Sequence, residues 1–94
     1  MQEEKQQLCK KHVFVCVNER PQGSCCQKVN GLEIFRSLKQ YVLAHAPHIW
    51  VSKSGCLGFC NDVGTSIVVY PEQKWFLQVT QEDVPNIVKY LGEQ

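Results

Sequence analysis

Six cysteines in a chain of 94 residues are the feature that most restricts its fold. Apart from Cys9 they form two groups on either side of a long amphipathic segment: Cys16, Cys25 and Cys26, then Cys56 and Cys60. In a secreted chain six thiols would predict three disulfides, but residues 1–7 (MQEEKQQ) lack the apolar core of a signal peptide. Structural disulfides are rare in a reducing compartment, so we expect a cytoplasmic protein whose thiols serve metal binding or redox chemistry.

The composition is that of one small globular domain. Hydrophobic residues make up 44% of the chain and charged residues 20%, which is too apolar for a disordered protein. The formal net charge of +1 excludes the basic footprint of a nucleic-acid binder. No run approaches the roughly 20 apolar residues that cross a bilayer. We expect residues 1–10 to form a flexible N-terminal arm and residues 11–94 a single domain, with no nucleic acid or membrane as partner.

The first half of the chain predicts a strand, a helix and a strand. Residues 11–17 (KHVFVCV) alternate apolar side chains, as a strand does, and residues 18–24 are loop-forming. Asn30 is expected to cap a helix that Pro47 ends, and residues 48–52 (HIWVS) form the next strand. The buried face of the helix is expected to carry Ile34, Leu38, Tyr41, Val42 and His45.

The second half predicts a hairpin and a closing helix. Residues 65–70 (TSIVVY) and 75–79 (WFLQV) are strands joined by a turn at residues 71–74. Thr80 and Asp83 suit the start of a helix whose regular part begins at Asp83 or Val84. Its apolar stripe is made of Val84, Ile87, Val88 and Leu91.

The order β-α-β followed by β-β-α predicts the fold class. A strand, a crossover helix and a strand form a parallel pair joined right-handedly, and the hairpin adds two antiparallel strands. We therefore expect an α/β (α+β) fold of the thioredoxin-like kind, with a mixed four-stranded sheet and two main helices. Trp50, Trp75 and Phe76 are interpreted as core packing rather than as ligand contacts.

This topology brings the cysteines together. Cys16 ends the first strand and Cys56 follows the second, and parallel strands end at the same edge of a sheet. Four thiolates bind either an iron–sulfur cluster or zinc. Structural zinc sites usually space their ligands as Cys-x₂₋₄-Cys at both ends, so the eight residues between Cys16 and Cys25 favour the larger cluster.

The residues around the second cysteine loop suit such a cluster. Backbone amides near Gly55, Gly58 and Phe59 can donate hydrogen bonds to sulfur, which raises a reduction potential. Lys53 and Arg20 are placed to offset part of its negative charge. A diferric Fe₂S₂ core (+2) and four thiolates (−4) would change the net charge of +1 to −1, and reduction would change it to −2.

Five segments resemble the thioredoxin-like [2Fe–2S] ferredoxins. They are residues 12–16 (HVFVC), 23–25 (GSC), 54–60 (SGCLGFC), 68–72 (VVYPE) and 79–85 (VTQEDVP). The resemblance runs from about residue 11 to residue 91, and the string around the last two cysteines is its most specific part. It implies a ferredoxin-type one-electron carrier with one [2Fe–2S] cluster, served by redox partner proteins, and not an enzyme.

The resemblance also implies the ligands and the assembly. The four ligands would be Cys16, Cys25, Cys56 and Cys60. The first loop is shorter than in many members and carries Cys26 where glycine is common, so Cys26 is an alternative to Cys25; the Gly-Ser-Cys match favours Cys25. Free-standing members tend to form homodimers, and similar domains are subunits of NADH-dehydrogenase-type or hydrogenase-type complexes.

Two functions of other classes remain open. A zinc-stabilised interaction module would use the same thiolates. A thiol–disulfide redox protein would use Cys56 and Cys60, but such pairs are Cys-x-x-Cys before a helix N-terminus, whereas here three residues intervene after the second strand. The three histidines (His12, His45 and His48) are interpreted as structural, and no Ser-His-Asp or paired-carboxylate arrangement stands out.

Overall fold

The seven elements of the structure confirm the expected order. A computed structural model describes residues 1–3, 9–17, 30–55, 57–58 and 64–92. The elements are β1 (Lys11–Cys16), α1 (Gly31–His45), β2 (Ile49–Ser54), β3 (Thr65–Tyr70), β4 (Lys74–Val79), the 3₁₀ turn η1 (Gln81–Asp83) and α2 (Val84–Gly92). In this described part no helix is both long and apolar enough to cross a membrane.

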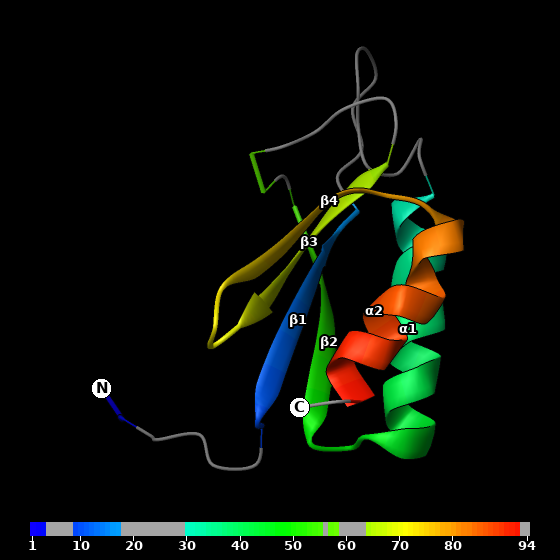
Figure 1. The fold of residues 1–94 in the computed structure, drawn as a ribbon. Helices are drawn as coiled ribbons and strands as arrows, with labels where there is room; N and C mark the ends of the chain where they lie inside the picture. The colour runs from blue at the N-terminus through cyan, green and yellow to red at the C-terminus, as the bar shows by residue number, and fades with distance from the viewer. Residues whose placement is uncertain (4–8, 18–29, 56, 59–63, 93–94) are drawn as a thin grey trace.

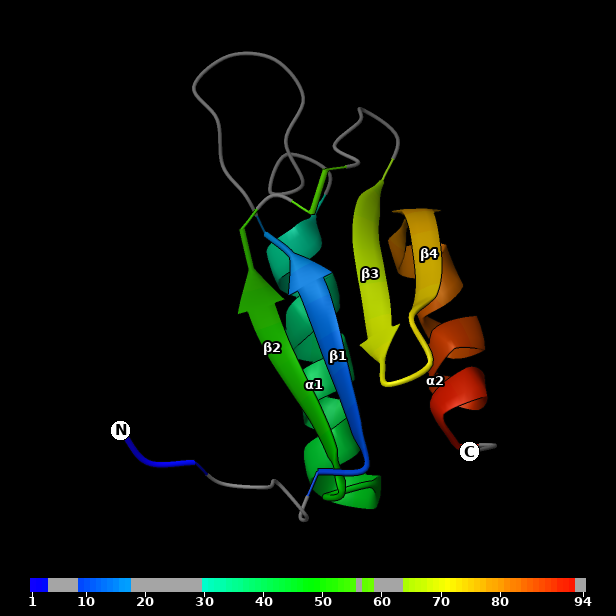
Figure 2. The ribbon, with the colours of Figure 1, turned by 90° about the vertical axis from the view of Figure 1, so that its left-hand side faces the viewer.

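The four strands form one mixed sheet in the order β2-β1-β3-β4. β1 and β2 are parallel, as the crossover helix requires, while β1 pairs with β3 and β3 with β4 in antiparallel fashion. Both helices cover the same face of this sheet (Figures 1 and 2). The thioredoxin-like α/β arrangement expected from the sequence is therefore confirmed.

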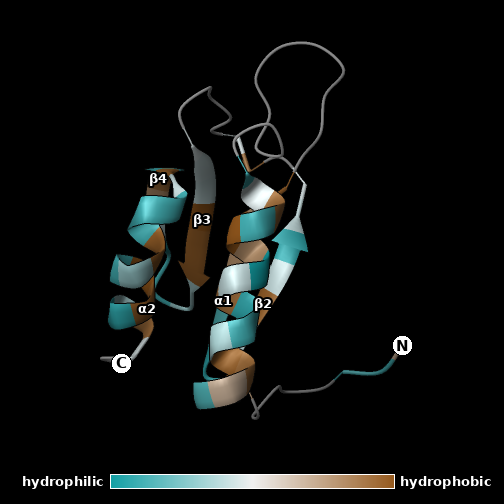
Figure 3. Ribbon diagram, turned by 90° about the vertical axis from the view of Figure 1, so that its right-hand side faces the viewer, coloured by the Kyte–Doolittle hydropathy of each residue, from teal (hydrophilic) through white to brown (hydrophobic). Residues whose placement is uncertain are grey.

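The core lies between the helices and the covered face of the sheet. Val13 and Val15 of β1 are fully buried there, with Ile67 and Val69 of β3. The helices contribute apolar side chains at four-residue steps: Ile34, Leu38 and Val42 from α1, then Ile87 and Leu91 from α2. Figure 3 shows the half of β3 towards its arrowhead in brown, as expected for a strand flanked by strands on both sides.

α1 begins directly after Asn30, as expected, but the way in which Asn30 caps it differs from the expectation. Asn30 has the left-handed φ of 66° and its side chain makes no capping hydrogen bond, so the predicted side-chain cap is wrong. Asparagine tolerates this conformation better than most residues. Its backbone carbonyl accepts the first helical hydrogen bond, from Ile34 N at 3.0 Å. Tyr41 is only half-buried and His45 is exposed, because both lie at the margin of the apolar stripe.

The start of α2 follows the prediction. Thr80 N donates to Asp83 Oδ2 at 2.9 Å, and Asp83 N donates to Thr80 O at 3.0 Å. These bonds satisfy amide groups that the first turn of a helix leaves unpaired. Pro85 lies in the first turn of α2, where the N–H that it lacks is not needed.

The face of the sheet opposite the helices is aromatic. Cross-strand pairing places Cys16, Ser52 and Ser54 on it together with six aromatic or aliphatic side chains, and we call the surface of these six the open face: His12, Phe14, Trp50, Val68, Tyr70 and Trp75. Trp50 and Trp75 are each 38% exposed, so their interpretation as core is wrong, whereas Phe76 points the other way and packs against the core. Side chains alternate across a strand, and no described helix covers this side.

Residues at the opposite end of β1 from Cys16 join three elements. Lys11 forms an ion pair with Glu72 in the turn between β3 and β4, and the hydroxyl of Tyr90 in α2 donates to the same carboxylate. Lys10 N donates to His48 O at 2.8 Å, which joins Lys10 to the residue before β2. The division into an arm of residues 1–10 and a domain of residues 11–94 stays a prediction.

We expect Glu72→Gln to lower the pKa of Tyr90. The hydrogen bond to the Glu72 carboxylate, with burial, raises this pKa from 10.0 to about 12. Because the pKa of Tyr90 is higher in the folded than in the unfolded protein, the protonated hydroxyl stabilises the fold below about pH 10. This stabilisation is lost as the pH rises from about 10 to about 12. Removing the carboxylate should therefore bring phenolate absorbance, titrated with alkali, back towards pH 10.0. Glu82→Gln is the matched control, and an unchanged titration in Glu72→Gln would contradict the contact.

Candidate metal centre

The ends of the two parallel strands lie side by side. Cys16, the last residue of β1, is the register partner of Ser54, the last residue of β2. Val17 N donates to Ser54 O at 3.0 Å and so extends the pairing one residue beyond β1. Figure 2 shows both arrowheads at the same edge of the sheet. We expected the strands that precede Cys25 and Cys56 to end at the same edge of the sheet, and the structure confirms this for β1 and β2.

Cys16 occupies a closed position at this edge. Its side chain is fully buried, and alternation along β1 places it on the same side of the sheet as Phe14. Its carbonyl accepts a 2.6 Å hydrogen bond from the hydroxyl of Thr65, the first residue of β3, which is also fully buried. A third strand thus holds the backbone of the first expected ligand in place.

We expect Thr65→Val to destabilise the protein by about 1–2 kcal/mol, because it removes a buried hydrogen bond while nearly preserving shape. Urea denaturation followed by far-ultraviolet circular dichroism would measure the loss. Ser37→Ala is the control, since Ser37 makes the same kind of hydroxyl-to-carbonyl bond, to Glu33 O, on an exposed surface. A change there should stay within about 0.5 kcal/mol. Equal losses in the two variants would contradict a special role for Thr65.

Two glycines shape the chain within and after the second cysteine group. Gly58 has a φ of +95°, which side-chain-bearing residues rarely adopt, so this position favours glycine. Gly64 lies directly against β4: a Cβ built on it would come within 2.6 Å of Val79 N and closer still to Val79 O. The path into β3 therefore requires glycine at position 64.

Charged and aromatic side chains flank the strand ends on the helix side. Lys53 lies one residue before the end of β2, and its Nζ is 5.7 Å from the ring centroid of Phe35 in α1. This is the geometry of a cation–π contact. Arg20, the other expected compensating charge, lies outside the described residues.

His12 has a structural environment. Its Nε2 lies 2.7 Å from Ser52 Oγ, and its ring stacks on Phe14 with centroids 4.1 Å apart. Burial lowers the pKa of His12, and the positive charge of Lys39 lowers it further, so the ring stays neutral near pH 7. His45 and His48 are exposed, at the end of α1 and just before β2. These positions are consistent with the structural interpretation of all three histidines.

The complete ligand set stays a prediction. Four of the cysteines that it concerns lie outside the described residues: Cys25, Cys26, Cys56 and Cys60. Within the described ranges no three His, Cys, Asp or Glu side chains are grouped to hold a metal ion, since only one expected ligand, Cys16, falls there. A thiol at the end of β1, opposite the end of β2, fits a cluster held by thiolates from two adjacent loops. The roles of Gly64 and Thr65 beside the site were not predicted from the sequence. The one sequence signal for them was a glycine directly before a strand rich in β-branched residues.

The fold and the strand-end thiol define a class of protein: a thioredoxin-like domain with a cysteine site at the carboxyl edge of its parallel strands. No family model matches the chain. It is 38% identical over 87 residues to a protein named ferredoxin, 2Fe-2S, from Aquifex aeolicus (strain VF5), covering 84% of this chain and 76% of that one. It is 36% identical over 86 residues to a ferredoxin, 2Fe-2S, from Clostridium pasteurianum, covering 85% and 82%.

Solved structures agree with these relatives. A thioredoxin-like [2Fe–2S] ferredoxin from Aquifex aeolicus superposes with a TM-score of 0.75 at 37% identity, covering 88% of this chain and 81% of that one. A crystal structure of the wild-type thioredoxin-like [2Fe–2S] ferredoxin from Aquifex aeolicus gives a TM-score of 0.74 at 34% identity, covering 84% of this chain and 82% of that one. The chain belongs to the thioredoxin-like [2Fe–2S] ferredoxin family.

Proposed function

We propose that this protein is a one-electron carrier that holds one [2Fe–2S] cluster through Cys16, Cys25, Cys56 and Cys60. The observation that carries the proposal is the register of Cys16 opposite Ser54, two residues before Cys56. The relatives are ferredoxins by name and support the same cofactor. Two solved variants of the Aquifex aeolicus ferredoxin each replace a cysteine by serine, and the replaced positions are separated as Cys56 and Cys60 are.

The residues of the chain hold and shield the site rather than perform chemistry. When bound, the cluster accepts and releases one electron at a time. Burial of Cys16 keeps water from its sulfur, and the bond from Thr65 fixes the backbone that carries it. No side chain has to transfer a proton or form a bond with a substrate, so the proposal describes a carrier and not an enzyme. Its partners are a reductase and an acceptor protein.

Metal analysis of the freshly purified protein tests the proposal. We expect two irons and two sulfides per chain, a reddish-brown colour, and a rhombic electron paramagnetic resonance signal after one-electron reduction. A colourless protein with one zinc per chain and no sulfide would instead support the zinc-stabilised interaction module. A metal-free protein with a reversible Cys56–Cys60 disulfide would support the thiol–disulfide alternative.

The proposal includes a homodimer formed through the open face. Trp50, Tyr70 and Trp75 expose aromatic surface there, and water-exposed aromatic patches of this kind mark interfaces. We expect Trp75→Gln to raise the dimer dissociation constant at least about tenfold, or about 1.4 kcal/mol, measured by sedimentation. Leu43→Gln is the control, since Leu43 is 69% exposed on α1. An unchanged dissociation constant in Trp75→Gln would contradict this interface.

The assembly and the location of the carrier complete the proposal. A chain that sediments as a monomer and co-purifies with larger redox subunits would favour the alternative of a module in an NADH-dehydrogenase-like or hydrogenase-like complex. We keep the cytoplasm as the proposed location, because thiolate ligands are stable against disulfide formation in a reducing compartment.

A further inference from the structure

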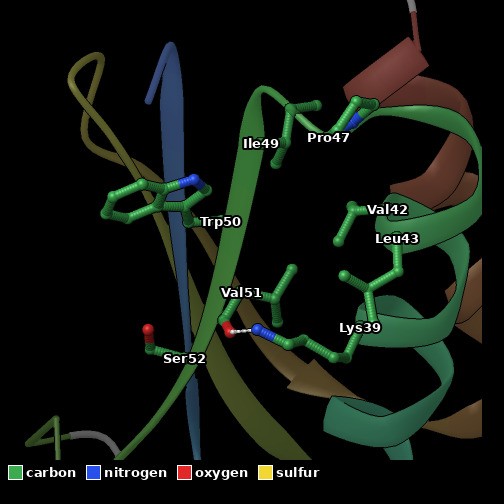
Figure 4. Close-up of a pocket in the computed structure, with 8 residues that line it drawn as sticks. All are labelled: Lys39, Val42, Leu43, Pro47, Ile49, Trp50, Val51 and Ser52. Carbon is green, nitrogen blue, oxygen red and sulfur yellow. Dashed lines mark hydrogen bonds between the residues drawn. The ribbon is translucent and has the colours of Figure 1, made fainter. Parts of the chain in front are cut away.

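A groove runs along the outer edge of β2, which is an edge strand of the sheet. It has a volume of about 270 Å³, and we call it the β2 groove. Its lining residues are Lys39, Val42, Leu43, Pro47, Ile49, Trp50, Val51 and Ser52 (Figure 4). In that view Val51 points towards α1 and Trp50 to the other side of the strand, so the groove follows the strand edge itself.

The groove combines apolar surface with the ammonium group of Lys39, which forms no ion pair with a described residue. Leu43 is 69% exposed and Trp50 is 38% exposed along it. Lys39 Nζ donates one hydrogen bond, to Val51 O on the outer edge of β2, at 3.2 Å. An ammonium group has three donors, and the only ion pair among the described residues is the one between Lys11 and Glu72. Lys39 can therefore bind a carboxylate without giving up an ion pair.

Two further basic residues lie on the two elements that form the groove. Arg36 lies one helical turn before Lys39 in α1, and Lys53 extends from β2 to the ring of Phe35. Glu33, in the first turn of α1, is the nearest acidic residue along that helix. Among the described residues of the C-terminal half, the acidic side chains belong to the β3–β4 turn and η1, at the β4 side of the sheet: Glu72, Glu82 and Asp83.

We propose that the β2 groove docks an extended segment of the redox partner that carries a carboxylate next to an apolar side chain. The carboxylate pairs with Lys39, and the apolar side chain contacts Leu43 and Pro47. The free edge of β2 offers backbone groups to an extended segment, as in strand addition. Ser54, where the same strand ends, is three residues beyond Val51, so this docking holds the partner about 10 Å from the start of the cysteine loop. The identity of the partner as a redox protein rests on the proposed function.

Fluorescence anisotropy of a labelled peptide tests the docking. The probe is the blocked pentapeptide Thr-Glu-Thr-Val-Thr, and its twin has lysine in place of glutamate. On the full-length purified protein we expect the acidic peptide to bind at least about fivefold more tightly than its twin at low salt, with the preference falling as salt is added. Lys39→Gln should weaken the acidic peptide about fivefold, and Leu43→Gln should weaken both peptides.

Two matched control variants remove a lysine and a leucine outside the β2 groove. Lys89→Gln on α2 takes away one exposed lysine, and Leu77→Gln on β4 takes away a leucine that is 47% exposed. Neither should change peptide affinity. Equal binding of the two peptides, or equal losses in Lys39→Gln and Lys89→Gln, would overturn the inference. So would a shift in oligomeric state in Lys39→Gln at unchanged peptide affinity, which would assign the groove to a second copy of the chain.

Iron, sulfide and paramagnetic resonance measurements on the same samples separate this inference from the proposed function. Lost docking in a protein with its full cluster content overturns the docking alone. Peptide binding in a protein that holds no iron or sulfide overturns the electron-carrier proposal, and with it the redox nature of the partner.

Discussion

Gly64→Ala is expected to destabilise the protein by about 3 kcal/mol or more, a large loss for the addition of a single methyl group. A Cβ at this position would lie within 2.6 Å of Val79 N and closer to Gln78 C and Val79 O, which are backbone atoms of β4. Backbone that is hydrogen-bonded in a sheet cannot move aside as the end of a flexible side chain can. β3 and β4 would have to separate at Thr65, whose hydroxyl holds Cys16 O.

Gly55→Ala is the matched control for that prediction. It adds the same methyl group at the end of β2, where no atom lies within 4 Å, so stability should change by no more than about 0.5 kcal/mol. Urea denaturation measures both variants, and visible absorption reports whether the cysteine site survives in each. A Gly64→Ala protein as stable as Gly55→Ala would show that the close approach of residue 64 to β4 is wrong.

Cys25→Ser is expected to abolish stable cluster binding, whereas Cys26→Ser keeps the cluster. A [2Fe–2S] cluster uses four thiolate ligands, and serine is a poor replacement for a soft sulfur donor. Iron and sulfide content and the resonance signal of the reduced protein measure the difference. The reverse result would assign the ligand to Cys26, and a retained cluster in both variants would mean that either thiol can complete the site.

Cys9→Ser is the negative control for this comparison, and Cys16→Ser is the positive control. Cys9 precedes β1, and its Sγ donates to Lys11 O at 3.0 Å, so its replacement should leave iron and sulfide content unchanged. Cys16 is fully buried at the end of β1 and is the one expected ligand in the described part of the chain. Cys16→Ser should lose the cluster as Cys25→Ser does. Full cluster content in Cys16→Ser would contradict the proposed ligand set itself.

Local patterns predicted most elements because short-range physics decides them. β3 was expected at residues 65–70 and is Thr65–Tyr70, and Thr80 and Asp83 were expected at the start of α2, where they are hydrogen-bonded to each other. The end of β2 was misjudged by two residues, since pairing with β1 continues through Lys53 and Ser54. Register with a neighbouring strand is a long-range property that a single-strand pattern does not contain.

The sequence by itself determined the order of elements, the parallel strand pair and the position of Cys16 at a strand end, because side-chain periodicity and crossover handedness suffice for these. Only the tertiary structure decided which face of the sheet the two described helices cover, and so why Trp50 and Trp75, on the other face, are partly exposed. It also decided that Thr65 holds Cys16 and that Lys39 lies over the edge of β2. These contacts join residues far apart in the chain, and strand order and helix packing, which no local pattern encodes, bring them together.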